Sequence, residues 1–191
     1  MTLFTYNWKY TEIKKFFKSL NLVYTPYLLF ENNYYVNNEL KNNINKHDKS
    51  LYSKLLCYNG KPFVKKPKLS IRYISNEIGY GLFAEQDFEE KDFVGEFCGT
   101  VTNSPPKESD KYNCSYKFES TLVIAPRKYG NEMQFANHSS VKNNVDWDNT
   151  NGDDEHIHII LIAIKKIKCG DEILVNYGES YWTQLGINPV E

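Results

Sequence analysis

Apolar residues recur at helical spacing early in this 191-residue chain and at strand-like spacing later. One face of a predicted helix near the amino terminus carries Ile13, Phe16, Phe17 and Leu20. Thr11 can cap the start of this helix, and Asn21 suits its end. A second, weaker helical stripe follows Asp48, and X-Pro steps between residues 61 and 67 then disfavour helix. We therefore expect a partly helical region of unknown role over residues 1–66.

The rest of the chain reads as many short strands separated by turns. We expect strands over residues 69–74, 82–84, 93–99, 116–118, 122–125, 144–147, 156–164 and 173–177. The segments 116–118 and 122–125 form one predicted hairpin, and 144–147 and 156–164 form another across a polar loop. Strands do not alternate with long helices, which favours an all-β body over a βαβ repeat. The pattern thus predicts a mainly β domain over residues 67–191.

Composition limits the classes of function. Lys and Arg total 23 against 24 Asp and Glu, and no basic stripe stands out, so we expect no direct nucleic-acid binding. The longest apolar run, residues 157–164, is too short to cross a bilayer, and we expect no membrane binding. The cysteines at positions 57, 98, 114 and 169 lack metal-ligand spacing, so we expect no metal. Nothing resembles a secretory signal, which favours reduced thiols in an intracellular protein.

Four short motifs carry the candidate chemistry. In chain order they are Gly79-Tyr80-Gly81-Leu82-Phe83-Ala84, Gly95-Glu96-Phe97-Cys98-Gly99, Asn137-His138-Ser139-Ser140 and the run from Gly170 to Gly178 that contains Tyr177. Each alone is weak: a Gly-x-Gly pair ordinarily marks a turn, and this pair lacks the third glycine of a dinucleotide fingerprint. An isolated Asn-His-Ser run would be a capped turn or a polar cluster. Their order and spacing make the set specific.

Together these motifs resemble the SET domain of protein lysine methyltransferases, in a small, zinc-free form like that of bacterial and viral members. The resemblance covers residues 69–182, although Ser140 and Lys142 stand where cysteine and proline are common. It implies a mainly β fold of small sheets, the β-clip, in which the C-terminal segment forms a pseudoknot. It also implies S-adenosyl-L-methionine as the methyl donor. Donor and target lysine would enter from opposite faces and meet in a narrow channel.

The resemblance assigns roles to individual residues. Tyr177 and Tyr116 would be catalytic, because the family's matching tyrosines border the methyl-transfer centre. The expected cofactor-binding residues are Gly79, Tyr80, Gly81, Leu82, Tyr116, Asn137, His138, Tyr177 and Trp182. Val175 and Tyr181 are expected along the substrate channel, where Val175 would affect how many methyl groups are added. Simple core packing accounts for Tyr181 and Trp182 nearly as well.

The chemistry of amine methylation explains the need for a phenol at Tyr177. A lysine ammonium has no lone pair, and its unperturbed pKa is roughly 10.4, so the site must favour the neutral amine. A dry channel and a positive sulfonium both penalise the charged form. A neutral phenol can bond the amine without adding a charge that would hold the proton. Alignment of the two reactants then supplies most of the acceleration.

The sequence is compatible with three functions. The leading hypothesis is a protein lysine N-methyltransferase acting on a basic, lysine-bearing histone tail, as in host-directed chromatin effectors that reach a host nucleus. The acidic loop over residues 146–155 could draw such a tail, although a solvated hairpin tip is the simpler interpretation. The second hypothesis is methylation of a non-histone protein. The third is a catalytically silent SET fold that binds peptides, against which the retained Tyr177, Asn137 and His138 argue.

Overall fold

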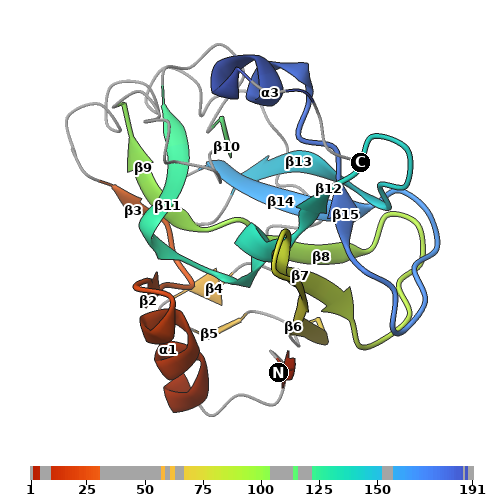
Figure 1. Cartoon of the computed structure of the whole chain (residues 1–191), viewed down its shortest axis with the longest axis horizontal. Coiled ribbons are helices and arrows are strands. Elements are labelled where there is room, and N and C mark those ends of the chain that lie inside the picture. Colours follow the sequence, from red (N-terminus) through yellow and green to blue (C-terminus); the bar gives the residue numbers. More distant parts are fainter. Residues whose placement is uncertain are drawn as a thin grey trace.

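The computed structural model describes residues 2–4, 10–30, 57–58, 61–62, 67–103, 114–115, 122–151, 157–186 and 188. Most of the regular structure in these ranges is strand (Figure 1). The strands are β1 Thr2–Phe4, β2 Val23–Tyr24, β3 Leu29–Phe30, β4 Cys57–Tyr58, β5 Lys61–Pro62, β6 Leu69–Ser75, β7 Gly79–Ala84, β8 Phe93–Glu96, β9 Gly99–Thr102, β10 Cys114–Ser115, β11 Val123–Gly130, β12 Asn137–His138, β13 Val145–Asn151, β14 Ile157–Ala163 and β15 Leu174–Val175. The helices are α1 Tyr10–Ser19, the 3-10 helix η3 Glu132–Phe135 and α3 Glu179–Leu185.

The strands form small sheets, which confirms the predicted mainly β class. One sheet has the order β1-β6-β7, a second has the order β10-β11-β9-β3 with β2 added to β11, and a third has the order β12-β15-β13-β14-β8. The predicted hairpin of residues 144–147 and 156–164 is confirmed as β13 and β14. β13 extends further than expected, since Asn151 faces Ile157 and Thr150 is buried, whereas β14 lies within the expected range. The polar loop is correspondingly shorter.

The predicted strand over residues 93–99 is instead two strands in different sheets. β8 pairs with β14, whereas β9 pairs with β11. Asn131 holds the break between them, because its Nδ2 donates to the Glu96 oxygen at 2.7 Å and its Oδ1 accepts from the Cys98 nitrogen at 3.3 Å. A Cβ at Gly99 would lie 3.1 Å from the Tyr129 oxygen, so glycine suits this close crossing.

The amino-terminal helix forms and packs on the β body, but it begins at Tyr10, so Thr11 lies within the helix and is not its cap. Asn21 follows α1 with φ 58°, the left-handed conformation expected where a helix ends. Ile13, Phe16 and Phe17 are buried in the same apolar cluster as core residues of the sheets. β1, β2 and β3 also extend the sheets through β6, β11 and β9. The proposed boundary at residue 66 stays a prediction, and the helix expected after Asp48 lies outside the described residues.

The C-terminal segment runs between two earlier strands, as the expected pseudoknot requires. β15 is parallel to both β12 and β13, and Val175 faces His138 on one side and Val145 on the other. Asn144 fixes this segment, because its Oδ1 accepts from the Leu174 nitrogen at 2.9 Å and its Nδ2 donates to the Glu172 oxygen at 2.7 Å. Of the strand predicted over residues 173–177, only β15 pairs. The Tyr177 nitrogen donates to the His138 ring instead of to a strand.

Candidate active site

Asn137 in β12 connects two distant segments through its side-chain amide. Its Nδ2 donates to the backbone oxygen of Tyr80 at 3.2 Å and to Oε1 of Glu172 at 2.9 Å. Both hydrogens of the amide are therefore engaged, and the carboxamide oxygen is the end that can accept a hydrogen bond from a ligand. The structure thus brings the motif of β7 and the motif of β12 together.

Sequence reasoning missed Glu172. This residue lies just before β15 and forms an isolated β-bridge with Phe83 of β7. The sequence shows an acidic residue in the motif from Gly170 to Gly178 that also contains Tyr177. The local pattern does not show which way this acidic side chain faces. The structure shows that Glu172 is half-buried and holds the Asn137 amide.

The two glycines of β7 are required for different reasons. Gly79 has φ +83°, which favours glycine, and a Cβ there would meet nothing within 4 Å. Gly81 is buried, and a Cβ there would lie 2.8 Å from Glu172 Oε1 and 3.1 Å from Asn137 Nδ2. The resemblance predicted that both glycines bind the cofactor. At Gly81 the chain's own side chains, with Ile74 Cδ1 nearest at 2.6 Å, already take the space that a Cβ would need.

The side chains of Tyr80 and Leu82, also predicted in this motif, point away from Asn137 and Glu172. The Leu82 side chain is fully buried in the core, and its backbone oxygen accepts from the Ile173 nitrogen at 2.7 Å. The Tyr80 ring packs edge-on against Phe16 of α1, with centroids 5.2 Å apart, and against Phe135 of η3 at 6.1 Å. The Tyr80 backbone therefore faces the site while its ring is anchored on α1.

Tyr177 lies beside Asn137 and His138 with its hydroxyl group fixed. Its Oη donates to the Ala136 oxygen at 2.8 Å, and its backbone nitrogen donates to Nδ1 of His138 at 3.1 Å. Because Nδ1 of His138 accepts a hydrogen bond, a neutral imidazole must carry its hydrogen on Nε2. Since the Tyr177 hydroxyl hydrogen is used on Ala136, its oxygen lone pairs are the groups that can face a substrate.

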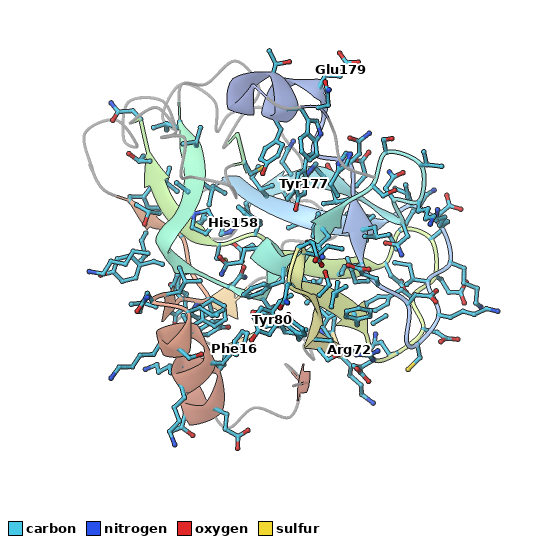
Figure 2. The ribbon with its side chains drawn as sticks, viewed as in Figure 1. Phe16, Arg72, Tyr80, His158, Tyr177 and Glu179 are labelled. Carbon is cyan, nitrogen blue, oxygen red and sulfur yellow. The ribbon has the colours of Figure 1, made fainter. Side chains whose placement is uncertain are left out.

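Two further rings pack against Tyr177. Tyr181 and Trp182 come from α3, a helix of seven residues that ends at Gly186 with φ 64°. The Tyr181 ring packs edge-on against Tyr177 at 4.7 Å, and the Trp182 ring stacks on Tyr177 at 6.0 Å and packs edge-on against His138 at 4.8 Å. Figure 2 shows Tyr177 on the side of the molecule toward α3, and Tyr80 on the side toward Phe16 and α1.

Trp182 provides a test of whether a ligand fits here. The ring is buried, and among the described residues its Nε1 has no hydrogen-bond acceptor. Leaving a buried donor unsatisfied costs about 1–3 kcal/mol. A ligand acceptor beside His138 and Tyr177 would recover that energy. The nitrogen-rich adenine of S-adenosyl-L-methionine has acceptors of this kind, so the residues present fit the expected cofactor.

The roles expected for Tyr116 and Val175 stay predictions. Tyr116 lies outside the described residues. Val175 is fully buried between the register partners of β12 and β13, so its influence on a lysine channel stays a prediction. Asp146 and Asp148 of the acidic loop are exposed on β13, and residues 152–156 lie outside the described residues.

Other titratable groups in the described parts of the chain lie elsewhere. Glu96 and His158 form a buried pair, with Oε1 and Nδ1 2.6 Å apart on the adjacent strands β8 and β14. This contact indicates an architectural role for Glu96. Burial raises the pKa of Cys114 to about 12, which keeps the thiol protonated. Within the described ranges, no group of three or more His, Cys, Asp or Glu could hold a metal ion, and no helix is both long and apolar enough to span a membrane.

Comparison with known proteins decides the family. The sequence model of the SET domain matches residues 79–178, a span that holds all four motifs. The chain belongs to the SET domain family. This confirms the resemblance inferred from the motifs, and the mainly β fold agrees with it.

Similar curated proteins are larger SET domain proteins. A SET domain-containing protein of Phaeosphaeria nodorum is 33% identical over 125 residues, covering 63% of this chain and 19% of the relative. The histone-lysine N-methyltransferase EZH2 of Chaetomium thermophilum is 29% identical over 125 residues, covering 54% of this chain and 8% of the relative. The histone-lysine N-methyltransferase CLF of Arabidopsis thaliana is 27% identical over 130 residues, covering 63% and 14%. The chain thus spans less than a fifth of the length of these relatives.

Solved structures share the fold. A crystal structure of an active polycomb repressive complex 2 in the basal state is 26% identical with a TM-score of 0.54, covering 65% of this chain and 17% of that chain. The same complex in an autoinhibited conformation bound to S-adenosylmethionine has a TM-score of 0.52 at 24% identity, covering 63% and 17%. At that identity the second likeness shows the fold alone.

Proposed function

We propose that this SET domain protein is an S-adenosyl-L-methionine-dependent protein lysine N-methyltransferase. The observation that carries the proposal is the fixed Tyr177 phenol beside Asn137 and His138, reached from segments far apart in the sequence. Relatives named as histone-lysine N-methyltransferases support the reaction class.

Tyr177 would orient the target amine. Its hydroxyl hydrogen is held by the Ala136 oxygen, so its oxygen can accept a hydrogen bond from the N–H of a neutral lysine side chain. That bond would leave the nitrogen lone pair directed away from the phenol and toward the donor. The rings of Tyr181 and Trp182 would keep water out, which disfavours the charged ammonium.

The cofactor supplies a methyl group on a positive sulfur atom when it is bound. Three groups of this chain are suited to hold it: the Asn137 carboxamide oxygen, the open backbone at Gly79 and the Trp182 indole N–H. Tyr116, expected near the methyl-transfer centre, remains part of the proposal as a predicted catalytic residue.

Histone is the proposed substrate. The named relatives act on histone lysines, and the exposed Asp146 and Asp148 on β13 offer negative charge to a basic tail. A histone target would place the protein in a nucleus, and the likeness to host-directed SET proteins would make it a host nucleus.

Incubation with radiolabelled cofactor tests the proposal. We expect transfer of label to purified histones, and a loss of at least about 100-fold in Tyr177→Phe, because losing the phenol misplaces the amine. Cofactor affinity, measured by calorimetry, should stay nearly unchanged in that variant. Tyr129→Phe is the matched control, since it removes the same atom from a half-buried tyrosine of β11.

The alternatives give different outcomes. Label on a non-histone protein of a cell lysate, with histones unlabelled, would favour a different protein target. Confirmed cofactor binding without any labelled protein would favour the silent, peptide-binding fold. Full turnover by Tyr177→Phe would remove the catalytic assignment of Tyr177.

A further inference from the structure

Glu172 is held firmly against the motif of β7. Its backbone oxygen accepts from Asn144 Nδ2 at 2.7 Å. The residues on either side of it bond to β7, with the Ala84 nitrogen donating to the Asp171 oxygen at 2.9 Å and the Ile173 nitrogen donating to the Leu82 oxygen at 2.7 Å. The backbone of Glu172 is therefore fixed, and the hydrogen bond from Asn137 Nδ2 holds its carboxylate at 2.9 Å.

Glu172 is also a half-buried carboxylate without a cation. Among the residues the structure describes, its only polar side-chain contact is with the neutral amide of Asn137. By contrast, the Glu85 carboxylate meets the Arg72 guanidinium, and the Glu89 carboxylate meets the Lys166 ammonium. Taking a carboxylate partly out of water without a positive partner is unfavourable, so a cationic ligand at this position would be bound more strongly.

The groups around Glu172 are suited to an ammonium ion. The Tyr80 oxygen and Glu172 Oε1 both lie within hydrogen-bond distance of Asn137 Nδ2, which places them on one small patch beside Gly81. The Asn137 carboxamide oxygen supplies a third acceptor. An ammonium group has three N–H donors and no acceptor, and it is drawn to negative charge.

We propose that Glu172 recognises the α-ammonium of the amino-acid end of the methyl donor. This rests on the proposed function. Glu172 would act in two ways, by orienting the Asn137 amide so that its oxygen faces the ligand, and by adding the negative charge that the ammonium needs. The second role distinguishes Glu172 from a residue that only supports Asn137.

Glu172→Gln separates the two roles. Glutamine keeps an oxygen that can accept from Asn137 and has the same shape, but it lacks the charge. The probes are S-adenosylhomocysteine and its analogue without the α-amino group, with affinities measured by calorimetry. We expect Glu172→Gln to bind S-adenosylhomocysteine about tenfold more weakly and the deaminated analogue with unchanged affinity.

Two further variants complete the experiment. Glu179→Gln removes an equal charge from an exposed site at the start of α3, and it should affect neither ligand. Glu172→Asp keeps the charge but retracts it by one methylene, and it should retain more discrimination between the two ligands than Glu172→Gln. This aspartate variant also provides the comparison with wild type if the glutamine variant does not fold.

Several results would overturn the inference. Equal weakening of both ligands by Glu172→Gln would show a purely structural role, and unchanged binding of both would show no role. Either result leaves the proposed function intact, provided that the wild-type protein binds S-adenosylhomocysteine. Failure of the wild-type protein to bind it would overturn both proposals.

Discussion

The two sides of the candidate site are held by different means. On the polar side, Tyr80, Asn137 and Glu172 are fixed by hydrogen bonds between strands and the segments next to them. On the aromatic side, Tyr177 and Trp182 are positioned by ring contacts, with Trp182 supplied by a short helix. The Tyr80 ring packs on α1 and Trp182 belongs to α3, and these two helices lie at opposite ends of the molecule in Figure 1.

This difference indicates how each side would respond to a ligand. The hydrogen-bond donors of the polar side are satisfied without a ligand, because both amide hydrogens of Asn137 have acceptors. Those of the aromatic side are not all satisfied, because the Trp182 N–H lacks an acceptor among the described residues. A seven-residue helix is marginal in isolation, so α3 depends on its ring contacts. We therefore expect cofactor binding to order the aromatic side more than the polar side.

Removing the support behind the polar side should have the largest effect. Phe16 of α1 is buried and contacts the rings of Tyr80 and Phe135. Phe16→Ala should lower the free energy of unfolding by about 3–5 kcal/mol, since it leaves a cavity in the core. The cofactor affinity should also fall several-fold, because the Tyr80 backbone faces the site. Urea unfolding and calorimetry measure the two effects.

Lys15 offers a control on the same helix. It is exposed, and Lys15→Ala should change stability by less than about 0.5 kcal/mol. A loss below about 1 kcal/mol in Phe16→Ala would contradict the packing of α1 on the β body.

Removing the Asn144 clamp, meaning the two side-chain hydrogen bonds from Asn144 to Leu174 and Glu172, should have the next largest effect. Asn144→Ala leaves the Leu174 nitrogen and the Glu172 oxygen without their side-chain partner, at a cost of about 2–3 kcal/mol in the free energy of unfolding. Cofactor affinity should fall, because the clamp positions Glu172. Asn143→Ala changes the half-buried neighbour and should leave affinity unchanged. Equal losses of affinity in the two variants would show that the loop as a whole, and not the clamp, positions Glu172.

The spacing of apolar residues was sufficient to predict the elements that are long and strongly periodic. The apolar face of α1, with Asn21 at its end, and the β13–β14 hairpin could be predicted from spacing alone. The break between β8 and β9 could not. It depends on hydrogen bonds from Asn131, 33 residues beyond Cys98, which no window of local sequence contains.

The candidate site was predictable only in part. Matching motifs indicated that Asn137, His138 and Tyr177 would meet, and these residues do lie together. The role of Glu172 depends on the register between its segment and β7, and neither segment alone reveals that register. Val175, which the motif match places along a channel, is buried in the core, and its role in a channel stays a prediction. Strand alternation shows which residues share a face, but not which face meets a ligand.

The smallest expected effect tests whether a ligand completes the aromatic side. Trp182→Phe removes a buried donor without an acceptor among the described residues, whereas Trp147→Phe removes a donor bonded to the Asn176 oxygen at 3.3 Å. Trp182→Phe should therefore cost less stability than Trp147→Phe, by about 1 kcal/mol. For cofactor affinity the order should reverse, with Trp182→Phe binding several-fold more weakly and Trp147→Phe nearly unchanged. Thermal unfolding with and without S-adenosylhomocysteine, together with calorimetry, measures both quantities. If the two variants lose the same stability and neither loses affinity, the Trp182 N–H is not used by the ligand, and the donors of the aromatic side need a ligand no more than those of the polar side do.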